Sequence, residues 1–243
     1  MFLNYDTFVA KLFKKKIIVL FSFTIYFLIC IRLVTDYGIA FDEDLQRLFA
    51  QNRLDYIINF FTNIFTGSIG SLNNQVEIMS PEYGVAFELP ALWAEKIIGF
   101  SDTRSQFFFR HHLIFLVSFI GSIFFYFLAL RKFNSWKLAL LGTMFLVSSP
   151  RIFAESFYNS KDIIFMYFFV INAFFAITFI EQPNKYNAIL FSFISALCIG
   201  VRVGGVILTI IVFYFLWIKF LRKDYNFKIT NSLLILLSSL LFF

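Results

Sequence analysis

Long apolar runs separated by short polar segments dominate this chain. A membrane-spanning helix needs roughly 20 predominantly apolar residues, fewer where the membrane is locally thin. Six runs approach or reach that length, at 17–35, 112–130, 137–150, 163–180, 188–201 and 203–218. A seventh run begins near Ile229 and is still apolar at Phe243. We therefore expect six to seven transmembrane helices, in a chain that stops inside its last span as a truncated product would.

The last two complete runs could form one long helix or two short ones. A single helix over 188–218 would be roughly 46 Å long at 1.5 Å per residue. It would place the basic cluster that follows residue 218 on the opposite side from the other basic clusters. Two spans that turn near Gly200–Gly205 keep the clusters on one side. The charge pattern therefore favours a helical hairpin.

Basic residues determine the expected orientation of these spans. They precede the first span, separate the second from the third and follow the sixth: Lys11, Lys14, Lys15 and Lys16; Arg131, Lys132 and Lys137; Lys219, Arg222, Lys223 and Lys228. If the spans alternate, all three clusters fall on one side, which the positive-inside rule assigns to the cytoplasm. We expect a multi-pass protein of the plasma (inner) membrane with a cytoplasmic N-terminus.

Composition agrees with this class. Hydrophobic residues make up 60% of the chain and charged residues only 15%, whereas a soluble domain is closer to half apolar and a quarter charged. The net charge of +6 lies beside the apolar runs, so it does not indicate a nucleic-acid partner. Cys30 and Cys198 fall inside apolar runs and give no disulfide or metal-binding pattern. The sequence predicts an all-α polytopic membrane protein, with residues 1–243 forming one module.

The first extracytoplasmic loop, 36–111, is by far the largest polar segment. It carries ten acidic and five basic residues up to Arg110. Within it, 44–65 has apolar positions spaced as in an amphipathic helix that lies on the membrane surface. Residues 66–84 are rich in Gly, Ser and Asn and predict a loop. Residues 85–100 predict a second interfacial helix, with Pro90 at a kink.

An acidic triplet, Asp42-Glu43-Asp44, opens this loop a few residues beyond the first span. One interpretation is that a carboxylate deprotonates an acceptor hydroxyl, or helps to bind a divalent metal ion. The alternative is a solvated loop in which Asp44 caps the helix that follows. Asp44 suits the cap best, so Asp42 and Glu43 are the candidates for chemistry.

The loop 149–162 gathers charged and polar residues between two spans on the same outer face. It contains Arg151, Glu155, Asn159, Lys161 and Asp162. Charged residues at a membrane border are functional candidates by default. The alternative is ordinary anchoring at the interface, with Asp162 favouring the N-terminus of the fourth span.

Two arginines complete the set of outer-face candidates. Arg110 opens Arg110-His111-His112, whose histidines point about 100° apart on a helix and so do not form a two-ligand metal face. Arg110 can instead hold a phosphate through a bidentate contact, or anchor the interface. Arg202 lies among apolar residues and needs water, a partner or a ligand. A phosphate and a structural pair with Asp162 or Glu155 are equally good partners for it.

At this point the chain resembles a known family. It is similar to the GT-C membrane glycosyltransferases, in particular the branch of dolichyl-phosphate-mannose–protein mannosyltransferase-like and aminoarabinose-transferase-like enzymes. Four ordered segments carry the resemblance: FDEDLQRLFAQ (41–51), FFFRHHLIFLVSFIGSIFFYFLALRKF (107–133), LVSSPRIFAESFYNSKDIIFMYFF (146–169) and ALCIGVRVGGVIL (196–208). They look like the family's Asp-Glu motif, its second span, its third outer junction and its Gly-rich turn.

The resemblance implies an inverting transferase that takes a sugar from a polyprenyl phosphate and works outside the cytoplasm. It implies that Asp42 is the catalytic carboxylate with Glu43 beside it, and that Asp162 and Arg202 match the family's second aspartate and basic turn residue. Acceptors would be a protein, lipid or glycan. The chain corresponds to the N-terminal part of such enzymes. A non-catalytic membrane fragment or scaffold is the main alternative. A transporter is disfavoured because the polar residues gather at one face and no repeat is visible.

Overall fold

The computed structural model describes residues 5–66 and 84–222, and every regular element in these ranges is a helix. In chain order they are α1 (Tyr5–Leu33), α2 (Phe41–Thr66), α3 (Glu88–Ile98), α4 (Thr103–Phe133), α5 (Trp136–Val147), α6 (Pro150–Tyr158), α7 (Asp162–Glu181), α8 (Lys185–Val201) and α9 (Val206–Leu221), with 3-10 turns at Val34–Asp36 and Val203–Gly205. The predicted seventh run and most of the predicted loop 66–84 lie outside the described residues.

Three described segments are long and apolar enough to cross a membrane: Lys15–Asp36, Thr103–Phe133 and Asp162–Glu181. A fourth is present if α5 and α6, which are bent by 68° at their junction, form one broken span. The helices α8 and α9 are apolar but shorter. The described chain is therefore all-α with three or four candidate spans, and the larger number expected from the sequence stays a prediction.

Three local predictions were wrong. The predicted loop 149–162 contains the helix α6, because Pro150 occupies a first-turn position where a missing N–H costs nothing. The predicted second span begins nine residues earlier than 112, since Asp102 caps α4 by accepting a hydrogen bond from the Ser105 N–H at 2.8 Å. Pro90 lies in the first turn of α3 and therefore produces no kink.

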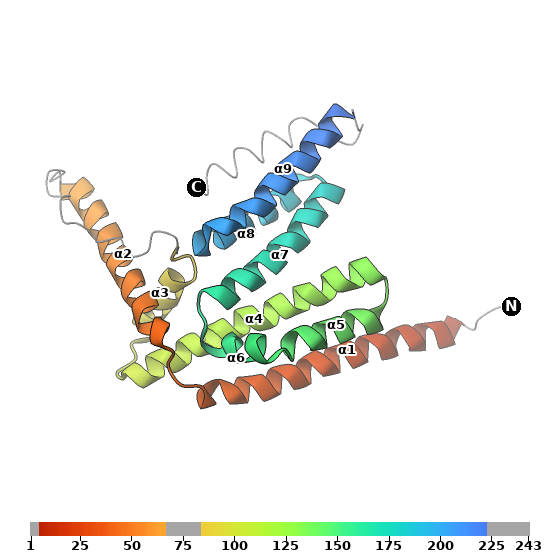
Figure 1. The fold of residues 1–243 in the computed structure, drawn as a ribbon, viewed down its shortest axis with the longest axis horizontal. Helices are drawn as coiled ribbons and strands as arrows, with labels where there is room; N and C mark the ends of the chain where they lie inside the picture. The colour runs from red at the N-terminus through yellow and green to blue at the C-terminus, as the bar shows by residue number, and fades with distance from the viewer. Residues whose placement is uncertain (1–4, 67–83, 223–243) are drawn as a thin grey trace.

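The helices form two groups that meet at α4 and α7 (Figure 1). The helices α1, α5 and α6 run beside α4, and α8 and α9 run beside α7. Gly121 of α4 lies directly against the Tyr167 ring of α7, so these two helices approach closely. The helix α2 stands away from both groups, with α3 packed near its base (Figure 1).

The bundle has two ends of different character. At the basic end, Arg131 of α4 pairs with Glu181 of α7 at 2.6 Å, and the Lys219 ammonium of α9 donates to the Ile180 carbonyl. The opposite end, here called the α2–α3 end, holds the starts of α4 and α7 and the junction of α8 with α9 (Figure 1). The predicted break between 188–201 and 203–218 is confirmed as the turn at Val203–Gly205.

Backbone hydrogen bonds close the α2–α3 end. The Gly84 N–H donates to the Val201 carbonyl at 3.1 Å, and the Ala86 N–H donates to the Gly200 carbonyl at 3.0 Å. These carbonyls belong to the last turn of α8, where no partner within the helix is available. The segment that leads into α3 therefore caps α8 and fixes the turn that carries Arg202.

Replacing Gly84 by alanine is expected to destabilise this closure. A Cβ atom on Gly84 would overlap the backbone carbonyl of Gly200, which cannot move without breaking the two hydrogen bonds. Such overpacking typically costs about 1–3 kcal/mol. The measurement is the midpoint of thermal unfolding in detergent. Gly142→Ala is the matched control, because a Cβ there meets no heavy atom within 4 Å. Equal midpoints for the two variants would contradict the packing described here.

Candidate functional site

A pocket of about 270 Å³ opens at the α2–α3 end. It lies between the first turns of α2 and the segment that joins α6 to α7. Its walls are formed by Ala40, Phe41, Asp42, Glu43, Gln46, Tyr158, Asn159, Ser160 and Lys161. Two segments more than 100 residues apart in the sequence therefore meet around one polar space. Four of the residues singled out from the sequence lie on its wall: Asp42, Glu43, Asn159 and Lys161.

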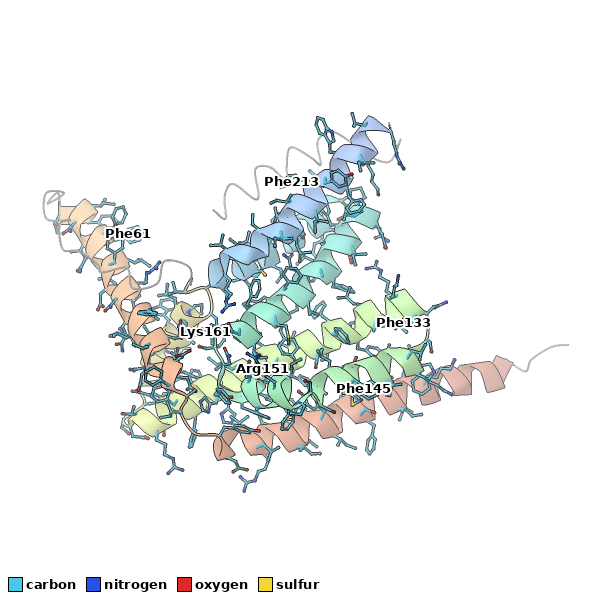
Figure 2. The ribbon with its side chains drawn as sticks, viewed as in Figure 1. Phe61, Phe133, Phe145, Arg151, Lys161 and Phe213 are labelled. Atoms are coloured by element: carbon cyan, nitrogen blue, oxygen red, sulfur yellow. The ribbon has the colours of Figure 1, made fainter. Side chains whose placement is uncertain are left out.

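An ion pair crosses the mouth of this pocket. The Lys161 ammonium donates to the Asp42 Oδ2 at 2.5 Å. The Asp42 side chain is 51% exposed and that of Lys161 is 20% exposed, so the carboxylate remains open to an incoming group. Figure 2 shows Lys161 where α7 begins, facing the α2–α3 end and far from Phe133 at the basic end. A carboxylate and a cation are thus held together on one accessible surface.

Glu43 has a buried position beside Asp42. Its Oε1 accepts a hydrogen bond from the Ala40 N–H at 2.9 Å, as the third residue of a capping box does. Its Oε2 lies 2.9 Å from the Nε2 of His111, which is fully buried. The prediction that Asp44 caps this helix is wrong, because α2 begins at Phe41 and Glu43 makes the capping contact.

Asn159 organises the start of α7. Its side-chain oxygen accepts from the N–H groups of Lys161 at 3.1 Å and Asp162 at 2.8 Å, and its amide nitrogen donates to Glu155 at 3.3 Å. The two N–H groups are among those that a helix start leaves without partners. Asn159 therefore fixes the backbone from which the Lys161 side chain extends to the pocket.

Asp162 and Arg202 form an ion pair next to this segment. The pairing agrees with one of the two alternatives that the sequence left open for Arg202. Both side chains are about one-third exposed, and the guanidinium carbon also lies 6.0 Å from the centre of the Phe165 ring. The pair ties the α8–α9 turn to the start of α7, one residue from Lys161.

Arg110 lies in a buried ionic network rather than on the pocket wall. Only 2% of Arg110 is exposed. Its guanidinium contacts the Glu88 carboxylate and lies 3.5 Å from that of Glu95, and both glutamates are 3% exposed. Two carboxylates from α3 thus neutralise a cation from α4. This geometry favours a structural role for Arg110 over phosphate binding.

The network extends to α2 through Arg47. Its Nε lies 3.2 Å from each Glu95 oxygen, and its guanidinium donates to the Gln106 side chain at 3.0 Å. The hydrogen bonds to Glu95 raise the pKa of the Arg47 guanidinium, so it stays charged. Together with the contact between Glu43 and His111, these bonds hold the base of α2 against α3 and α4. They thereby position Asp42 opposite Lys161.

The structure brings together most, but not all, of the site residues expected from the sequence. Asp42, Glu43, Asn159 and Lys161 line the pocket, Asp162 and Arg202 lie beside it, and Arg110 is buried behind it. Sequence reasoning missed several residues that shape the site: Arg47, Glu88, Glu95, Gln106 and His111. A signal was available, because Glu88 and Glu95 are seven residues apart in a mostly apolar helix and share one face.

No group of three or more His, Cys, Asp or Glu side chains within the described ranges is arranged to hold a metal ion. What the described pocket offers an incoming molecule is a carboxylate, an ammonium group, and amide and hydroxyl groups. Comparisons of the chain with protein-family models, with curated proteins and with solved structures gave no match.

Proposed function

We propose that this chain is an inverting glycosyltransferase that moves a sugar from a polyprenyl phosphate to an acceptor hydroxyl at the extracytoplasmic face of the membrane. The observation that carries the proposal is the meeting of Asp42 and Lys161 across an accessible pocket at one end of a bundle of apolar helices. A lipid-linked donor requires this placement, because its prenyl tail stays in the bilayer while its sugar phosphate reaches the polar border. The six-to-seven-span topology and the cytoplasmic N-terminus belong to the same proposal.

The chemistry assigns a role to each partner of the ion pair. Asp42 accepts the proton of the acceptor hydroxyl as its oxygen attacks the anomeric carbon of the sugar. The bond from that carbon to the phosphate oxygen breaks, and polyprenyl phosphate leaves with the electron pair. Lys161 offsets the negative charge that develops on the phosphate. Attack opposite to the leaving group inverts the anomeric configuration.

The surrounding contacts support this division of roles. The carboxylate of Glu43 is buried and already contacts the Ala40 N–H and the His111 ring. It therefore positions the first turn of α2 rather than accepting a proton. Arg202 pairs with Asp162, the residue next to Lys161, and its side chain remains about one-third exposed, so it adds positive charge near the phosphate. If a divalent metal ion supplied positive charge instead, Asp42 would be a ligand for it, although the described residues form no group of three or more ligands.

Replacing Lys161 by methionine is expected to weaken use of the donor. The variant keeps most of the length of the side chain but removes the charge that faces the phosphate. Hydrogen bonds to charged groups contribute roughly 1.5–3 kcal/mol, so the donor concentration at half-maximal transfer should rise on the order of tenfold or more. The measurement is initial rate against concentration of a radiolabelled polyprenyl-phosphate sugar, with membranes supplying the acceptor.

Two controls accompany this variant. Lys161→Arg keeps the positive charge and should retain most of the donor affinity. Lys185→Met removes a lysine at the start of α8, at the basic end of the bundle, and should leave the kinetics unchanged. If Lys161→Met behaved like the wild type, or if Lys185→Met were equally impaired, Lys161 would have no specific role in donor binding.

A further inference from the structure

A second and larger hollow lies at the other end of the bundle, between α1, α4 and α5. Its volume is about 720 Å³, within the range of about 300–1,000 Å³ that small-molecule sites occupy. Its wall is almost wholly apolar and is formed by Val19, Leu20, Phe23, Thr24, Phe27, Phe119, Ile123, Tyr126, Phe127, Leu130 and Trp136, with Lys15 and Lys16 at one end. We call this hollow the α1 groove.

The length of the α1 groove matches one leaflet of a bilayer. Its wall on α1 runs from Lys15 to Phe27, a rise of roughly 18 Å at 1.5 Å per residue. Its wall on α4 runs from Phe119 to Leu130, a rise of roughly 17 Å. Half of the hydrocarbon core of a membrane measures roughly 15 Å. Measured along either helix, the groove is therefore about as long as the hydrocarbon layer of one leaflet is thick.

Charge distinguishes the two ends of this groove. Lys15 and Lys16 stand where the groove reaches the basic end of the bundle, and no acidic side chain is found among the described residues that line it. Arg131 and Lys132, in the last turn of α4, lie at the same end of the bundle but do not line the groove. The far end of the groove, near Phe27 and Phe119, is aromatic and uncharged. A ligand that complements this pattern has an anionic head and an apolar tail.

We propose that the α1 groove binds one anionic phospholipid, with its phosphate at Lys15 and Lys16 and an acyl chain against the apolar wall. Amphipathic complementarity selects this occupant, because a zwitterionic lipid gains less from the two lysines. The bound lipid also fills the junction between α1 and the rest of the bundle, where only 17% of the most apolar stretch of Lys15–Asp36 is buried by protein. The site lies at the opposite end from Asp42 and does not depend on the proposed transfer reaction.

Trp136 provides a probe inside the groove. The chain contains three tryptophans, so Trp93→Phe and Trp217→Phe leave Trp136 as the single tryptophan, which is excited selectively over tyrosine. The full chain is placed in nanodiscs that contain phosphatidylglycerol or phosphatidylcholine with brominated acyl chains, and quenching is measured at low salt. We expect the anionic lipid to be preferred by roughly 30-fold, which corresponds to two lysines near a membrane surface.

Two paired variants decide the proposal. Lys15→Gln with Lys16→Gln should abolish the preference, whereas Lys132→Gln with Lys185→Gln removes equal charge from the basic end outside the groove and should preserve it. Thr24→Phe narrows the groove without changing charge and should reduce quenching by both lipids. Three results would each overturn the proposal. The two lipids could quench Trp136 equally in the parent protein, or both double variants could lose the preference equally. Neither lipid could reach Trp136, because a second copy or another segment covers it.

Discussion

Replacing Asp42 by asparagine should reduce sugar transfer by about 10²- to 10⁴-fold, the usual contribution of a positioned general base. Asparagine preserves the shape of the side chain but cannot accept the proton of the acceptor hydroxyl. Because the Asp42 side chain is half exposed and outside the buried network, the variant should fold and insert normally. The measurement is the initial rate of release of polyprenyl phosphate from a labelled donor, at donor concentrations above the half-maximal value.

Asp44→Asn is the matched control for this variant. Asp44 is exposed, lies two residues further along the same turn of α2 and does not line the pocket. The same chemical change there should leave transfer within about twofold of the wild type. If both variants were active, or if Asp44→Asn lost as much activity as Asp42→Asn, the assignment of Asp42 as the base would be wrong.

Replacing Arg110 by methionine should strongly destabilise the protein. Glu88 is 3% exposed and would lose its cationic partner, while Glu95 would keep only Arg47. Removing one member of a buried ion pair typically costs 3–5 kcal/mol, because the remaining charge is left without compensation in a medium of low dielectric constant. For a chain of this size the midpoint of thermal unfolding should fall by roughly 10 °C.

Two comparisons separate this electrostatic cost from loss of packing. Adding Glu88→Gln to Arg110→Met removes the uncompensated carboxylate and should recover part of the lost stability. Arg104→Met changes an exposed arginine on a different face of α4 from Arg110. It should shift the midpoint of thermal unfolding by less than the equivalent of about 0.5 kcal/mol. A double variant no more stable than Arg110→Met would mean that the charge of Glu88 has no part in the effect.

The helical architecture could be anticipated because apolar runs and basic flanks are local signals. The break between α8 and α9 followed from charge parity alone, and the start of α2 was missed by only three residues. The bend between α5 and α6 could not be anticipated. Both helices are short, and their 68° angle depends on packing against α4 rather than on the run of apolar residues. A helix also began earlier than predicted where a capping side chain, such as Asp102, precedes the apolar run.

The sequence predicted most of the residues that belong to the candidate site, but not all of the ion pairs that they form. Membrane topology placed Asp42, Lys161, Asp162 and Arg202 on one face, since each adjoins the end of an apolar run. It did not reveal that Lys161 pairs with Asp42, and it left Arg202 between a phosphate and a structural pair with Asp162 or Glu155. The position of Asp42 depends on how the base of α2 packs against α3 and α4, through the ion pair of Arg47 with Glu95 and the contact of Glu43 with His111. Such contacts join residues tens of positions apart and leave no mark in the local pattern.

The products formed from a lipid-linked donor test the proposed function most directly. Purified chain in proteoliposomes would be incubated with labelled polyprenyl-phosphate mannose or polyprenyl-phosphate aminoarabinose and a membrane extract as acceptor. We expect polyprenyl phosphate and glycosylated acceptor in equal amounts, with the anomeric configuration inverted, and neither product with Asp42→Asn. Donor left intact by the wild type, or consumed equally by wild type and Asp42→Asn, would show that the pocket at Asp42 and Lys161 does not carry out this transfer.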